Sequence, residues 1–221
     1  MTNKLHYYDI VGTVIPGVLL VAWAAVCFPA LSDITSSVGL ASTFGLLAGL
    51  ALAVFAGQLV QALGSIIGPA LYRSWGGRPS DKALSDGLGR YLPKDAAARV
   101  RQKLQAELGT ETNPQYLFLH AMQLTDAANE GRAARFNGLY AYHRSQVVLV
   151  LIAIVMAIGS AAFGRLASWH WWHIAALFPG LLALLALAWH RARQRAIYYV
   201  REVLLAAEKI MDEREVETRQ Y

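Results

Sequence analysis

The sequence predicts an all-α membrane protein with four transmembrane helices, a small helical cytoplasmic cap, and both termini inside the cell. Its 221 residues are 56% hydrophobic and only 16% charged, whereas soluble domains average about 25% charged residues. The apolar residues gather in four stretches close to the roughly 20 residues that a transmembrane helix needs. We place the four spans near Ile10–Leu31, Val38–Val60, Gln146–Gly164 and Trp171–Trp189.

Lysine and arginine residues set the orientation of these spans. Of the 20, one precedes the first span, 11 lie between the second and third, and seven follow the fourth. Only Arg165 lies between the third and fourth spans. Because cytoplasmic segments carry the excess of Lys and Arg, the middle segment and both termini are expected inside, which is a multi-pass N-in/C-in topology.

The first apolar stretch is interpreted as an uncleaved anchor. It runs past the roughly 7–15 apolar residues of a signal-peptide core, and a second span follows almost at once. The single cysteine, Cys27, lies within this anchor, so no disulfide can form inside one chain.

The second apolar stretch is too long for a simple span. The 39 residues from Ile34 to Tyr72 contain no charge, and as a helix they would reach about 58 Å. The hydrocarbon core of a membrane is only ~30 Å thick. We therefore expect the second helix to protrude into the cytoplasm, to end before Pro69, and to need a covering surface.

The middle segment is expected to supply that surface as short helices, since no alternating strand pattern is present. Glycine, proline and capping residues mark their ends. The expected helices run from Ser80 as N-cap to Tyr91, from Pro93 to Leu108 with Gly109 as the stop, and from Asn113-Pro114 to near Gly131.

The last third of the chain is expected to form two long helices. The helical pattern runs from Arg132 without interruption into the third span, and the fourth span continues into the tail. The tail either forms a short coiled coil or packs against the chain's own cap, because its apolar residues repeat at heptad spacing at Ile197, Val200, Leu204, Ala207 and Met211. The resulting organisation is an N-terminal transmembrane hairpin at 1–72, a helical cytoplasmic segment at 73–144, a C-terminal transmembrane hairpin at 145–190, and an amphipathic cytoplasmic tail helix at 191–221.

A ridge of small residues marks the second span. Gly45, Gly49, Ala53 and Gly57 fall every four residues on one helix face. Small residues let helices approach closely in lipid. The ridge is therefore a candidate for helix packing, either against another span of the same chain or against a second copy in a homo-oligomer.

Catalytic motifs are absent from the sequence. Neither a Gly-rich phosphate loop nor a Gly-x-Ser-x-Gly elbow occurs. His170 and His173 lack a third ligand nearby and make a poor metal site. We therefore expect no enzyme activity, catalytic residue, cofactor or metal, and we interpret the pI of 9.4 as a consequence of topology rather than of nucleic-acid binding.

Two motifs beside the spans carry a family resemblance. The first is Trp75-Gly76-Gly77-Arg78-Pro79-Ser80, and the second is Asn137-Gly138-Leu139-Tyr140-Ala141-Tyr142-His143-Arg144-Ser145. Together they resemble a family of uncharacterised bacterial multi-spanning membrane proteins with Trp-Gly-Gly-x-Pro-Ser/Thr and Asn-x-x-Tyr-x-aromatic-x-Arg-Asn motifs. Ser145 stands where that family has Asn. The resemblance implies a bacterial inner (cytoplasmic) membrane location and brings no established activity.

The polar residues of these motifs are candidates for binding at the cytoplasmic headgroup level. One reading is contact with lipid phosphate or with a helix C-terminal carbonyl, and the other is recognition of a small anionic ligand or a protein partner. The residues are Trp75, Arg78, Asn137, Tyr140 and Arg144. The expected function is a non-enzymatic oligomeric membrane effector or accessory subunit, by analogy with phage-defence effectors, and the alternative is a small oligomeric channel or transporter subunit.

Overall fold

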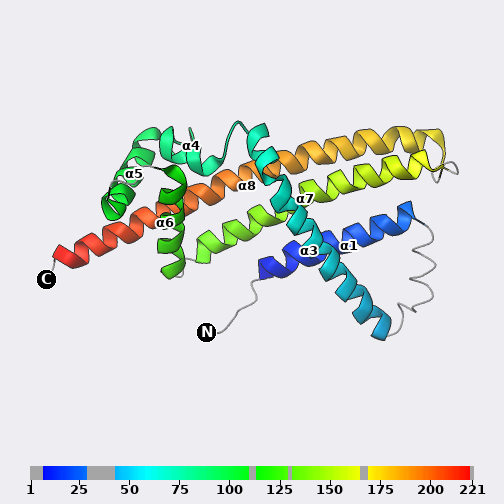
Figure 1. Ribbon diagram of the computed structural model, residues 1–221, viewed down its shortest axis with the longest axis horizontal. Coiled ribbons are helices and arrows are strands. Elements are labelled where there is room, and N and C mark those ends of the chain that lie inside the picture. Colours follow the sequence, from blue (N-terminus) through cyan, green and yellow to red (C-terminus); the bar gives the residue numbers. More distant parts are fainter. Residues whose placement is uncertain (1–6, 29–42, 110–112, 129–130, 165–168, 220–221) are drawn as a thin grey trace. The chain divides into compact units, whose positions relative to one another are not determined.

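The computed structural model describes residues 7–28, 43–109, 113–128, 131–164 and 169–219, and this part of the chain is helical without strands (Figure 1). The all-α prediction is thus confirmed for these residues. Residues 32–37, between the first two predicted spans, and most of residues 165–170, between the last two, lie outside them. The helices are α1 (Tyr7–Cys27), α3 (Thr43–Ser74), α4 (Pro79–Ser85), α5 (Lys94–Leu108), α6 (Pro114–Ala127), α7 (Gly131–Ala162) and α8 (Trp171–Arg219).

Three helices are long and apolar enough to cross a membrane, namely α3, α7 and α8. They overlap the second, third and fourth predicted spans, although each helix extends well beyond its span on one side. The first predicted span falls on α1, whose apolar part, Gly12–Cys27, is shorter than the other three. The chain is therefore an all-helical protein with three candidate membrane spans in its described part.

The end of α3 corrects a sequence expectation. The helix does not stop before Pro69 but continues through it to Ser74. Proline removes one backbone donor, and apolar helices tolerate this loss when neighbouring groups satisfy the freed carbonyl. The helix ends shortly before Gly76 and Gly77. Their φ angles of 77° and 126°, which only glycine adopts easily, stop the helix from continuing.

The start of α4 also differs from expectation. Ser80 is not the N-cap: Arg78 takes that position, Pro79 follows inside the first turn, and the Ser80 hydroxyl donates to Asp81 at 3.1 Å. Proline prefers the first helical position because its φ is already helical. The helix ends at Ser85 rather than Tyr91, since the next turn contains glycines with positive φ.

Several other helix boundaries agree with the sequence, but α6 ends at Ala127 rather than near Gly131, which instead begins α7. Gly109 ends α5 with φ 77°, and the Asn113 side chain caps α6 by accepting from the Gln115 amide at 3.0 Å. Helices α7 and α8 run without interruption, and α8 continues through Pro179 into the tail.

The chain divides into two compact units. The first unit contains 1–67 and 141–192, and the second contains 68–140 and 193–221. Helices α3, α7 and α8 contribute residues to both. Because the unit boundaries follow packing rather than predicted membrane depth, they differ by a few residues from the predicted segment ends.

Close helix packing holds the first unit together. Backbone meets backbone where α1 crosses α3, so a Cβ on Gly17 would overlap the Ala53 carbonyl and a Cβ on Gly57 would overlap the Thr13 carbonyl. The Gln61 side-chain amide also donates to the Thr13 hydroxyl at 2.9 Å. Elsewhere α1, α7 and α8 share a small apolar cluster built on Trp23, Ala153, Ala157, Leu177, Phe178 and Leu181.

One continuous apolar core holds the second unit together. Helices α4, α5 and α6 contact one another, and both α7 and the tail part of α8 add residues to the same core. Four of the five apolar tail residues that recur at heptad spacing are buried there, namely Val200, Leu204, Ala207 and Met211. The tail therefore packs within its own chain.

Ion pairs also join α5 to α8. They link Arg99 to Glu208 and Lys103 to Asp212 at the surface, where each pair contributes little to stability.

Candidate ligand-binding site

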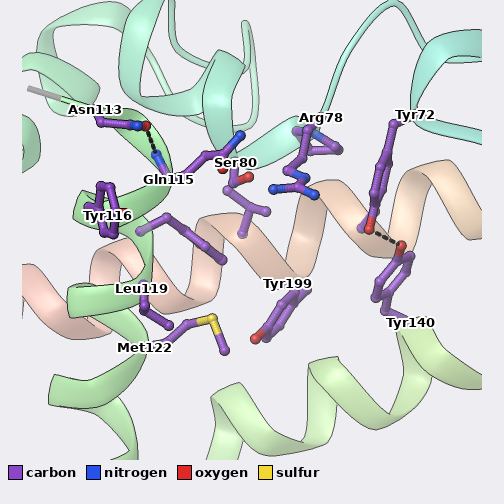
Figure 2. Close-up of a pocket in the computed structure, with 14 residues that line it drawn as sticks. Tyr72, Arg78, Ser80, Asn113, Gln115, Tyr116, Leu119, Met122, Tyr140 and Tyr199 are labelled. Atoms are coloured by element: carbon purple, nitrogen blue, oxygen red, sulfur yellow. Dashed lines mark hydrogen bonds between the residues drawn. The ribbon is translucent and has the colours of Figure 1, made fainter. Parts of the chain in front are cut away.

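A pocket of about 510 Å³ opens in the second unit (Figure 2). Its size lies in the range of pockets that bind small molecules, roughly 300–1,000 Å³. We call it the Arg78 pocket. It is lined by Tyr72, Arg78, Pro79, Ser80, Asn113, Gln115, Tyr116, Phe118, Leu119, Met122, Tyr140, Ala196, Tyr199 and Val200.

Three tyrosines from three helices form one side of the Arg78 pocket. The hydroxyls of Tyr72 and Tyr140 are hydrogen-bonded at 2.9 Å. The Tyr140 ring in turn stacks on Tyr199 with an interplanar angle of 8° and ring centres 6.4 Å apart. Since Tyr140 is only 8% exposed, the cluster ties α3, α7 and α8 together and gives the pocket a rigid aromatic wall.

Arg78 brings the positive charge of the pocket. It lies in the turn between α3 and α4, and its guanidinium stacks over the Tyr72 ring at 5.3 Å. Stacking on a ring face leaves the in-plane N–H donors of a guanidinium available for a ligand. Arg78 forms no ion pair with a described residue, and no carboxylate occurs among the described lining residues. The pocket therefore favours an anion.

Tyr199 is held in its neutral form. Burial, followed by the nearby charge of Asp126 and by Tyr72, raises the pKa of Tyr199 to about 12. The phenol is thus protonated near neutral pH and adds no negative charge to the pocket.

The opposite side of the pocket is apolar. Figure 2 shows Leu119 and Met122 from α6 across from Arg78 and Tyr72, with Tyr199 between them. Asn113 and Gln115 lie near the rim, where the Asn113 side chain is occupied in capping α6. The arrangement suits a ligand with a negatively charged end and a planar or apolar body.

The five predicted binding residues do not form one site in the structure. Arg78 and Tyr140 both line the Arg78 pocket, whereas Asn137 is exposed on α7 and is not part of its lining. Trp75 is 5% exposed, packs edge-on against Tyr72, and lines a separate pocket. Its buried indole N–H has no acceptor among the described residues, a situation that costs about 1–3 kcal/mol.

Arg144 belongs to the first unit. Its guanidinium donates to the Ser65 hydroxyl at 3.4 Å and lies over Gly64 of α3. This arginine thus contacts a neighbouring helix of its own unit.

Sequence reasoning did not identify Tyr72 and Tyr199 as site residues. In the sequence, Tyr72 stands out only as the end of an uncharged stretch. Tyr199 lies between the apolar positions that repeat along the tail. A signal was available in the tyrosine pair Tyr198-Tyr199, because tyrosine on the buried face of an amphipathic helix usually meets a polar partner.

Within the described residues, no group of three or more His, Cys, Asp or Glu side chains is arranged to hold a metal. Comparison with models of protein families, with curated proteins and with solved structures gives no match for this chain. The described helices define an all-helical membrane protein, with three candidate spans among the described residues and a ligand-sized pocket in the second unit.

Proposed function

We propose that the protein is a non-enzymatic membrane effector or accessory subunit whose second unit is a helical cytoplasmic cap that binds a small anion with a planar or apolar body. The observation that carries the proposal is the Arg78 pocket, where one cation and three tyrosines face an apolar wall without a carboxylate in the described lining. The charge distribution supports a cytoplasmic position for this unit and for both termini. The family resemblance supports a bacterial inner membrane.

Binding is tested on the purified full chain in detergent. The probes are salicylate and adenosine monophosphate, with their uncharged counterparts salicylamide and adenosine. We expect at least one anion to raise the thermal unfolding midpoint and its counterpart to have no effect. The Arg78→Gln variant should bind the anion roughly tenfold more weakly, since a hydrogen bond to a charged group is worth about 1.5–3 kcal/mol.

Arg90→Gln is the matched control for this experiment. Arg90 also stacks on a tyrosine, Tyr91, at 4.9 Å, but it lies outside the Arg78 pocket. If Arg90→Gln and Arg78→Gln weaken binding equally, or if no probe binds the wild type, the proposed ligand class is wrong.

Membrane action is tested by induced expression in bacteria. We expect growth and membrane potential to fall in cells with the wild-type protein and to stay higher in cells with Arg78→Gln at equal membrane levels. Unchanged growth and potential in both strains would contradict the effector role.

Self-association of the spans is part of the proposal. Because Ala53 and Gly57 already pack against α1, contact between copies is assigned to the opposite face of α3, where Phe44, Phe55, Leu59 and Ile66 are exposed. Cross-linking in membranes should capture a species larger than the monomer. The alternative of a channel would need polar side chains in the spans to line a pore. Thr13 and Gln61 do not support it, since these two polar side chains are hydrogen-bonded to each other.

A further inference from the structure

A second, smaller pocket of the second unit borders the same turn that carries Arg78. Its volume is about 250 Å³, and it shares only Pro79 with the Arg78 pocket. We call it the Lys82 pocket. It is lined by Trp75, Gly77, Pro79, Lys82, Gly87, Leu88, Tyr91, Arg193 and Ile197.

The Lys82 pocket is positively charged. Lys82 and Arg193 both line it, and no acidic residue occurs in its described lining. Lys82 forms no ion pair with any residue that the structure describes. A larger pocket between α5 and α8 also contains cations, but there Arg99 and Lys103 are paired with carboxylates. The charge of Lys82 is therefore less compensated than the charges of Arg99 and Lys103.

The glycines of the turn place the lysine. A Cβ on Gly76 would lie 3.1 Å from Lys82 Nζ, and a Cβ on Gly77 would lie 3.2 Å from Lys82 Cε. The lysine side chain thus lies against bare backbone that any other residue would cover. Trp75 forms the adjoining wall.

The position of Arg193 along α8 relates the pocket to the membrane surface. Arg193 follows Trp189, the last residue of the predicted fourth span, by four residues of continuous helix. Four residues correspond to about 6 Å along the axis. Tryptophan residues favour the membrane–water interface, and Lys and Arg just beyond a span reach toward the phosphate level.

We propose that the Lys82 pocket binds the phosphate group of an anionic phospholipid. Lys82 and Arg193 supply the charge, and the walls of Trp75 and Tyr91 limit the site to a compact group. This site is separate from the Arg78 pocket, and it does not depend on the ligand proposed there.

The test uses the purified full chain in dodecyl maltoside and counts bound lipids by native mass spectrometry. The probes are phosphatidylglycerol, phosphatidylcholine of the same acyl chains, and inorganic phosphate as a competitor. We expect phosphatidylglycerol to bind more tightly than phosphatidylcholine, and Lys82→Gln or Arg193→Gln to weaken its binding roughly tenfold.

Arg191→Gln is the matched control. Arg191 is exposed, lies two residues before Arg193 on α8, and does not line the Lys82 pocket. Equal losses in Arg191→Gln and Arg193→Gln would show general attraction to the membrane surface and would overturn the proposal. Lys82→Arg keeps the charge and should retain binding, so a loss there would also count against it.

Inorganic phosphate distinguishes the two sources of the phosphate group. If millimolar phosphate displaces the lipid from the wild type, and Lys82→Gln abolishes phosphate binding, the pocket serves a soluble phosphate and the lipid assignment is overturned. If phosphate has no effect while the pocket variants lose lipid, the lipid assignment is supported.

Discussion

Tyr199 joins the Arg78 pocket to the core of the second unit. Its ring stacks on Tyr140, meets Phe118 edge-on, and packs against the apolar core residues. The raised pKa of its phenol, about 12, follows first from this burial. Tyr199 thus both lines the Arg78 pocket and contributes to the stability of the second unit.

Alkaline titration tests this assignment. An unfolded tyrosine loses its proton near pH 10 and folded Tyr199 near pH 12, so the folded chain binds more protons in between. The free energy of unfolding should therefore fall by roughly 2 kcal/mol as pH rises through this window. Tyr199→Phe should remove that part of the loss, as measured by chemical unfolding at pH 9 and pH 12.

Tyr116→Phe serves as the control for the alkaline experiment. Tyr116 lines the same pocket but is 59% exposed, so this variant controls for the removal of a tyrosine hydroxyl from the pocket. A pH dependence in Tyr199→Phe identical to that of the wild type would contradict the assignment.

At the scale of the helices, contact between α1 and α3 depends on two glycines. Gly17 and Gly57 bring the backbones together, and a Cβ at either position would overlap a carbonyl of the other helix. The small-residue ridge of α3 is thus used, at Ala53 and Gly57, for packing within the chain.

Gly57→Ala should destabilise this contact. Overpacking costs about 1–3 kcal/mol, which outweighs the gain of up to about 1 kcal/mol from replacing a helical glycine. Gly159→Ala in α7 meets nothing within 4 Å, so it should be neutral or stabilising. The thermal unfolding midpoint should therefore fall in Gly57→Ala and stay the same or rise in Gly159→Ala, and equal shifts in the two variants would refute the close contact.

How far the sequence predicts the structure depends on the feature considered. Strong local signals such as Gly109 and Asn113 located helix ends correctly. The prediction of Ser80 as an N-cap was wrong because Pro79 takes the first position of that helix. The prediction that α3 ends before Pro69 was wrong because the loss of one hydrogen bond does not end an apolar helix. The tyrosine wall was beyond sequence reasoning, since its members come from three helices that only tertiary packing brings together.

At the scale of the whole molecule, the charge distribution is strongly one-sided, the described residues contain three candidate spans, and the second unit carries both positively charged pockets. Both proposed sites require this unit to face the cytoplasm, where a soluble anion or the inner leaflet can reach it. The N-in/C-in topology is therefore the claim on which the proposals depend.

Site-directed cysteine labelling tests this topology most directly, because Cys27 is the chain's single cysteine and can be replaced by alanine. On that background, Arg90→Cys probes the second unit and Phe163→Cys probes the end of α7, since both positions are exposed. A membrane-impermeant maleimide should label Phe163→Cys in spheroplasts whose inner membrane is intact, and Arg90→Cys only after that membrane is opened. Labelling of Arg90→Cys in intact spheroplasts would contradict the account.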